Sequence, residues 1–180
     1  MSSERVEAVG YVKKGNQHLH AAISVSPAAW VEKYTSMRFG AHVLVDKLLG
    51  EIAAAHLAAK RGEYSIGAFL QRGFPPTLLL AGYTLEVGFK ALYVARVRPT
   101  AAERAFHNHE LCGLAKAAKV PLGPAEQRLC EVLSAVTIHL GRYPVPKRQH
   151  DAVASHGYGE VTLEEFKKLD QRIAGLLAEA

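Results

Sequence analysis

The chain has 180 residues, of which 49% are hydrophobic and 22% charged, and its net charge is +5 with the nine histidines counted as neutral. This composition excludes a disordered chain, and we expect a single domain over residues 1–180, with an appendage at 1–26 and a helical bundle at 27–180. The positive charge favours anionic partners such as RNA or phosphates. The first residues lack an apolar stretch typical of a signal peptide, so we expect a cytoplasmic protein.

The N-terminal residues show the alternation of a β-hairpin. Leu19, Ala21, Ile23 and Val25 alternate with more polar residues, and a Lys-Lys-Gly-Asn turn at 13–16 precedes them. We predict that residues 5–12 pair with residues 17–25. An isolated hairpin is marginally stable, so it must pack on the bundle or on a partner.

Two long helices follow. Ser26-Pro27 is typical of a helix start, and apolar residues at three-then-four spacing extend the first helix to Arg61-Gly62. The second is predicted to begin at Pro75-Pro76 and to end before Pro99. Its segment 78–96 is apolar on nearly all sides, which indicates a buried core helix, and its interruptions by Gly and charged residues argue against a membrane span.

Three shorter helices complete the predicted all-α, up-and-down four-helix-type bundle. We predict a short helix at 109–119 capped by Asn108, a helix from Gly123-Pro124 to Gly141, and a last helix introduced by a capping box of Thr162 and Glu165. Each has an apolar stripe at helical spacing: Leu111, Leu114, Ala115 and Ala118 on the first; Leu129, Val132, Leu133, Val136 and Leu140 on the second; and Phe166, Leu169, Ile173 and Leu176 on the last. A polar loop at 145–159 separates the last two, and loops of that length are often functional.

The familiar catalytic and metal-binding motifs are missing. The sequence has no phosphate-binding glycine loop, dinucleotide fingerprint or serine elbow. His107 and His109 are better explained by helix capping and surface exposure than by metal ligation, and Cys112 and Cys130 lack the partners of a zinc site. We therefore expect no metal and no cofactor, and two small buried thiols.

Two groups of residues remain as candidate sites. Glu86 and Lys90 are one helical turn apart on the apolar helix, and a buried pair must be satisfied within the fold or by a partner. Arg142 directly follows the predicted helix that ends at Gly141, and its guanidinium has a planar fork of donors suited to phosphate. It could instead cap the last carbonyl groups of that helix.

Three motifs together resemble the HEPN superfamily: Leu85-Glu86 followed by Phe89-Lys90-Ala91-Leu92, then His109-x-Leu111-x-x-Leu114, then Gly141-Arg142-Tyr143-Pro144. The resemblance covers residues 75–147. It implies a helical bundle that often dimerises and acts in bacterial toxin–antitoxin, phage-defence or RNA-processing systems. Many members are metal-independent endoribonucleases, whereas others bind RNA or nucleotides or act as protein partners.

The chain departs from the catalytic pattern of that superfamily. Seven residues separate Arg142 from His150, and seven separate Arg148 from His156, which is longer than the interval in the superfamily. Arg104 and His109 have a fitting interval but lie before the short helix, in the wrong connection.

The main hypothesis is a dimeric helical module that binds RNA, a nucleotide or another phosphate-bearing partner, without efficient catalysis. The binding residues would be Arg142, Tyr143, Lys147 and Arg148, and the buried polar network would comprise Glu86, Lys90 and His109. One alternative is a metal-independent endoribonuclease that uses Arg142 and His150 as catalytic residues. Another is an antitoxin-like protein that binds a cognate protein partner, with no nucleic-acid or membrane role.

Overall fold

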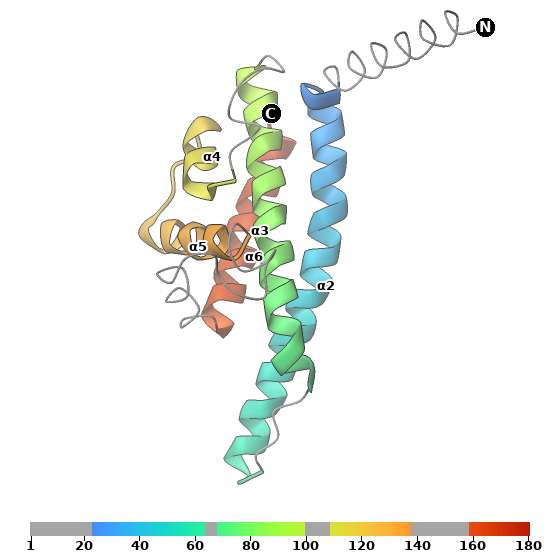
Figure 1. Ribbon diagram of the computed structural model, residues 1–180, viewed down its shortest axis with the longest axis vertical. Helices are drawn as coiled ribbons and strands as arrows, with labels where there is room; N and C mark the ends of the chain where they lie inside the picture. Colours follow the sequence, from blue (N-terminus) through green and yellow to red (C-terminus); the bar gives the residue numbers. More distant parts are fainter. Residues whose placement is uncertain (1–22, 64–67, 100–108, 138–158) are drawn as a thin grey trace, which may run out of the picture.

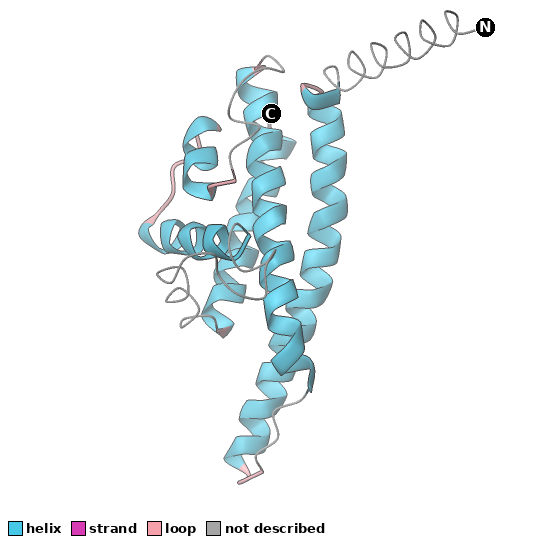
Figure 2. Cartoon of the chain, in the orientation of Figure 1, coloured by secondary structure: helices cyan, strands magenta, loops and turns pink. Residues whose placement is uncertain are grey.

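The computed structural model describes residues 23–63, 68–99, 109–137 and 159–180, and all the elements in these ranges are helices (Figure 2). The elements are α2 (Pro27–Lys60), α3 (Ala68–Val97), α4 (Leu111–Ala117), α5 (Pro124–Ala135) and α6 (Glu160–Ala178). The prediction of an all-α bundle is therefore confirmed. The predicted hairpin lies outside the described residues except for its last three, and these are not a strand, because Ile23 and Ser24 are helical and Val25 is in a turn that leads into α2.

Helix α3 is the centre of the bundle. It runs antiparallel to α2 and contacts α4, α5 and α6 as well (Figure 1). Leu85, Phe89 and Leu92 on α3 are fully buried. By length and composition the stretch Arg72–Val97 could cross a membrane, but 72% of its most apolar window is buried inside the protein, as expected of a core helix.

One hydrophobic core joins all five helices. The predicted apolar stripes of the shorter helices face it: Leu111, Leu114, Ala115 and Ala118 around α4; Leu129, Leu133 and Val136 around α5; and Phe166, Leu169 and Ile173 on α6. On α2 the buried apolar residues are Tyr34, Ala41, Val45 and Leu48. The helical spacing thus located the core-facing sides of the three shorter helices correctly, whereas on α2 it missed the buried Val45.

Two glycines allow α3 to approach its neighbours closely. A Cβ atom on Gly88 would lie 2.9 Å from both Ile173 Cγ2 on α6 and Tyr34 Cε2 on α2. A Cβ atom on Gly82 would clash with Thr137, which follows α5, and would lie 3.2 Å from the carbonyl oxygen of Leu133. Since no side chain larger than hydrogen fits at either position, these glycines set the distance between α3 and both layers around it.

The predicted starts of α3 and α4 are wrong. Helix α3 begins at Ala68, so Pro75 and Pro76 lie inside it; Phe74 just before them packs on the core, and this tertiary contact favours the helix upstream of the prolines. Helix α4 begins at Leu111, where the Glu110 carboxylate accepts hydrogen bonds from the backbone N–H groups of the first turn, so the helix does not start at His109. Asn108 lies outside the described residues.

The start of α6 and the end of α5 also differ from the prediction. Helix α6 begins at Glu160, with Gly159 as its N-cap, so the capping box based on Thr162 is wrong by most of a turn. The Thr162 hydroxyl instead accepts from the Gly159 N–H at 3.5 Å. Helix α5 ends at Ala135, and Val136 and Thr137 continue as a wider π-helical turn; the rest of its predicted span, to Gly141, is outside the described residues.

Candidate functional site

Glu86, Lys90 and His109 contact one another where α3 meets the start of α4. The ammonium of Lys90 donates to Glu86 Oε1 at 2.8 Å, and His109 Nδ1 lies 3.0 Å from each carboxylate oxygen of Glu86. Glu86 and Lys90 are buried, whereas the imidazole of His109 is 42% exposed. Because the Glu86 carboxylate is paired with Lys90 and also contacts His109, the network holds a buried charge and ties the chain before α4 to the central helix.

A further polar contact connects this corner to α5. The backbone N–H of Leu111, the first residue of α4, donates to the hydroxyl of the buried Ser134 at 2.9 Å. The region around Glu86 therefore brings together α3, α4 and α5, three helices that are separate in the sequence. Seven residues after Ser134 the sequence reaches the Gly141-Arg142-Tyr143-Pro144 motif.

The other predicted site residues lie outside the described residues. These are Arg142, Tyr143, Lys147, Arg148 and His150, together with the loop 145–159 up to its last residue. Their roles in phosphate binding or catalysis remain predictions.

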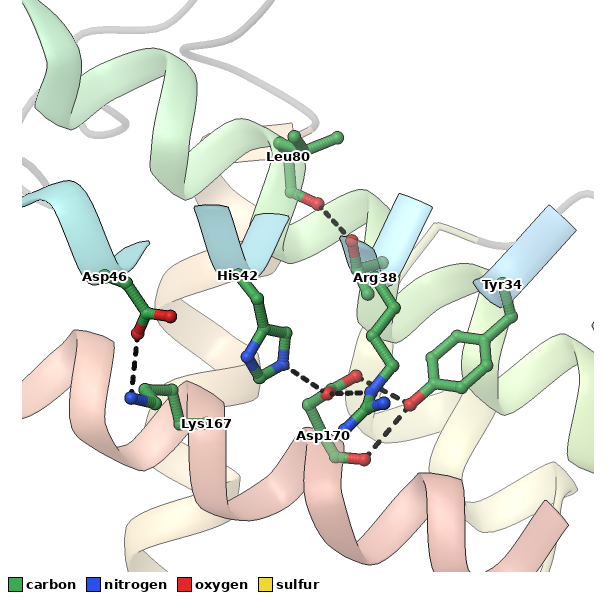
Figure 3. A network of polar contacts seen from close by, with 8 residues as sticks. Tyr34, Arg38, His42, Asp46, Leu80, Lys167 and Asp170 are labelled. Atoms are coloured by element: carbon green, nitrogen blue, oxygen red, sulfur yellow. Dashed lines mark hydrogen bonds and ion pairs between the residues drawn. The ribbon is translucent and has the colours of Figure 1, made fainter. Parts of the chain in front are cut away.

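A second polar cluster joins α2 to α6, and sequence reasoning missed it (Figure 3). Its centre is the carboxylate of Asp170, which has no exposed surface. Tyr34 Oη donates to Asp170 Oδ1 at 2.6 Å, while Arg38 Nε and His42 Nε2 each lie 2.7 Å from Oδ2. Three polar side chains thus converge on one buried acid.

The spacing of the residues explains this convergence. Tyr34, Arg38 and His42 are four residues apart along α2 and therefore share one face of the helix, which packs antiparallel to α6. Asp170 follows Leu169 and lies between the buried Phe166 and Ile173, so it occupies a core-facing position. The sequence signal that could have indicated this cluster is the charged Asp170 within the apolar stripe of the last helix.

The cluster changes the ionisation of its members. Burial, followed by the charge of Asp170, raises the pKa of the Tyr34 phenol well above its ordinary value, so Tyr34 stays protonated and donates to the acid. The hydrogen bond to Asp170 likewise raises the pKa of the Arg38 guanidinium. The Arg38 and His42 side chains are partly exposed, whereas the Asp170 carboxylate behind them is buried and contacts three polar side chains. Such a hydrogen-bonded network is typical of a contact that stabilises the packing of two helices.

The two thiols belong to the α4–α5 layer. Cys130 is buried and Cys112 is half-buried, so the expectation of two buried thiols holds fully for Cys130. Burial, and then the nearby charge of Glu110, raises the pKa of Cys112 to about 11. Burial also raises the pKa of Cys130. Both groups are therefore neutral thiols at physiological pH, which disfavours a nucleophilic role.

Within the described ranges no three His, Cys, Asp or Glu side chains lie together in a group that could hold a metal ion. In comparisons with known proteins, no protein-family model, curated protein or solved structure matches this chain. The arguments for function therefore depend on the geometry above and on the sequence motifs.

Proposed function

We propose that the chain is a HEPN-like helical module that binds RNA or another phosphate-bearing partner through Arg142, Lys147 and Arg148, without efficient catalysis. The observation that supports this most directly is the contact between Glu86 and His109. It joins the first two of the three motifs that carry the resemblance, although the two residues are 23 positions apart in the sequence. The net charge of +5 adds long-range attraction for a polyanion.

RNA binding can be tested by its salt dependence. Phosphate contacts release counterions, so the logarithm of the affinity should fall linearly with the logarithm of the salt concentration. Changing Arg142, Lys147 and Arg148 together to alanine should reduce the slope by roughly 2, because each contact to single-stranded RNA contributes about 0.7. The measurement is fluorescence anisotropy with a labelled RNA at several salt concentrations.

A matched control separates local contacts from overall charge. Lys33, Lys60 and Arg61 are exposed on α2, and changing all three to alanine lowers the net charge by the same three units. This control should keep the wild-type slope. Equal slopes for the two triple variants, or no RNA binding at low salt, would remove the proposal.

The endoribonuclease alternative uses the same preparation. Arg142 and His150 provide the fork of donors and the base that metal-independent cleavage of a phosphodiester requires. Labelled RNA would be incubated with the wild type, Arg142→Ala and His150→Ala in the presence of a chelator. Cleavage that both substitutions abolish would favour the enzyme, whereas equal cleavage by all three proteins would exclude it.

A homodimer is part of the proposal, and the outer face of α2 is the surface that supports it. Phe39, Val43 and Leu57 are 75%, 52% and 59% exposed on this face, with the small residues Gly50 and Ala53 between them. Antiparallel pairing of two α2 helices about a two-fold axis would place Phe39 near the partner's Leu57 and Val43 near the partner's Ala53. Apolar side chains would then face apolar side chains across the two-fold axis, which is the self-complementarity that a symmetric dimer needs.

The dimer is tested by measuring molar mass with light scattering. Phe39→Glu should shift the protein toward the monomer, because it replaces the most exposed apolar side chain of this face by a charge that the dimer would bury. Val161→Glu is the control, since Val161 is 74% exposed at the start of α6, on a different element. A monomeric wild type, or equal effects of the two substitutions, would contradict this interface.

A further inference from the structure

An open groove lies between the end of α4 and the first turn of α5. Its volume is about 540 Å³, which is within the range of small-molecule sites. Cys112 and Lys116 line it from α4, and Lys119, Val120, Pro121 and Leu122 line it from the connection to α5. All of these lining residues belong to the described part of the chain, and none is among the residues proposed above to bind RNA phosphates.

Two of the described residues that line the groove are charged, and both are lysines. Lys116 and Lys119 are exposed, and neither side chain has a hydrogen-bond or ion-pair partner among the described residues. Among those residues no carboxylate lines the groove; Glu126 nearby is paired with Arg172 at 2.8 Å, and the Glu110 carboxylate accepts from the backbone N–H groups that begin α4. Two ammonium groups that form no ion pair suit an anion that carries two negative charges.

The backbone of Lys119 adds an independent observation. Its φ is +56°, in the left-handed region that side chains disfavour. The turn is a helix C-cap in which Val120 N–H donates to the Ala115 carbonyl at 2.8 Å, and glycine is the usual residue at the Lys119 position of such a turn. This left-handed turn ends α4 and leads into the connection that lines the groove, and the Lys119 side chain is part of that lining.

The rest of the lining is apolar or neutral. Val120 is buried beneath the groove, and Pro121 and Leu122 continue the apolar wall. The Cys112 thiol contributes no negative charge at neutral pH, since its pKa is raised to about 11. The groove thus combines a doubly positive side with an apolar side.

We propose that this groove binds a small phosphate monoester that carries an apolar or aromatic group, with Lys116 and Lys119 on the phosphate and Pro121 and Leu122 against the apolar part. A phosphate monoester has nearly two negative charges at neutral pH and therefore matches the two ammonium groups. Lysines in the last turn of a helix also offset its partial negative charge. That structural role needs neither an apolar wall nor a residue with a positive φ beyond the helix end. The experiment below separates this role from phosphate binding.

Phenyl phosphate is the probe, and isothermal titration calorimetry is the measurement. The wild type should bind phenyl phosphate saturably, and inorganic phosphate and phenol more weakly, because each has half of the recognised chemistry. Lys119→Gly and Lys116→Gln should each weaken phenyl phosphate binding by about tenfold or more, since each removes a charge-assisted hydrogen bond.

The chain offers a matched control in Arg98. Arg98 also has a positive φ, of +52°, and is exposed just after α3, but it does not line the groove. Arg98→Gly and Lys119→Gly both remove one positive charge and one strained backbone position, and each should raise the melting temperature by roughly 2 to 4 °C. Only Lys119→Gly should lose affinity. Absence of saturable binding, lysine variants that bind like the wild type, or equal weakening in both glycine variants would overturn the proposal.

The source of the phosphate is decided by a second arm with RNA. If the natural ligand is an RNA end, an oligoribonucleotide with a 5′-phosphate should bind more tightly than the same sequence with a 5′-hydroxyl, and Lys119→Gly should remove the difference. If the two RNAs bind equally while phenyl phosphate still depends on Lys119, the ligand is a free small phosphate. The titration with phenyl phosphate does not involve RNA. The groove can therefore bind phenyl phosphate as proposed even if the proposed RNA binding fails.

Discussion

Asp170 shows at the scale of a single residue how the fold holds a buried charge. Its carboxylate is fully buried and has donors from Tyr34, Arg38 and His42. Asp170→Asn keeps the size but replaces an acceptor oxygen by a donor that faces other donors. We expect a loss of about 2 to 3 kcal/mol in the free energy of unfolding by urea, less than the roughly 3 to 5 kcal/mol for a fully buried pair because Arg38 and His42 are partly exposed.

Asp46→Asn is the control for this prediction. Asp46 is 59% exposed and pairs with Lys167 across the same two helices, at 2.8 Å. An exposed ion pair contributes less than about 1 kcal/mol, so the loss should be much smaller. Similar losses for the two variants would mean that burial of Asp170 does not matter.

Tyr34 gives a prediction for the dependence of stability on pH. Its pKa is raised in the folded protein, so the corresponding stability is fully present below the ordinary tyrosine pKa of about 10 and is lost as the pH rises above it. Tyr34→Phe should cost about 1.5 to 3 kcal/mol at pH 7, because a hydrogen bond to a charged group is lost. From pH 10 to pH 11 the wild type should lose up to about 1.4 kcal/mol more than the variant.

Urea unfolding at pH 7, 10 and 11 measures both effects. The protein's other tyrosines are present in both proteins, so their contribution to the alkaline decline cancels in the difference. Parallel declines in the two proteins would contradict a raised pKa for Tyr34.

At the scale of an element, the position of α3 depends on Gly88. An alanine there would place its Cβ atom against Ile173 and Tyr34, and overpacking of this kind costs about 1 to 3 kcal/mol. Gly175→Ala on α6 is the matched control, since a Cβ atom there would have nothing within 4 Å. We expect Gly175→Ala to stabilise the protein by about 0.5 to 1 kcal/mol through helix propensity. The free energies of unfolding of the two variants should therefore change in opposite directions.

At the scale of the whole molecule, the shared core predicts one cooperative unfolding transition. The single tryptophan, Trp30, lies in the first turn of α2, whereas far-UV circular dichroism reports on all the helices. Because buried residues of all five helices form one cluster, the two signals should have the same midpoint in urea. An earlier fluorescence transition would show that the start of α2 unfolds independently of the rest.

The elements that the sequence predicted well are those with strong apolar periodicity. The core-facing residues of α4, α5 and α6 followed directly from their spacing, because a helix that packs on one side needs an apolar stripe. Helix starts were predicted less well. Pro75 and Pro76 are typical of a first turn, but local preference is worth less than the burial of Phe74 upstream of them.

The candidate sites also differ in how well the sequence predicted them. Glu86 and Lys90 were found because their spacing along one helix is a local property, and the His109 side chain meets them in the fold. The cluster around Asp170 involves Tyr34, more than 130 residues away, and no local rule connects the two. Arg142 and the residues after it lie outside the described part of the chain, so their role stays a prediction from sequence.

The sequence by itself determined the helical class of the protein and most of the faces that its helices bury, because the energy of an apolar stripe depends on spacing within one segment. Only the tertiary structure decided which helices meet. It placed Asp170 against three donors on α2 and Lys119 in the lining of a groove, since these juxtapositions depend on how separate segments pack against one another.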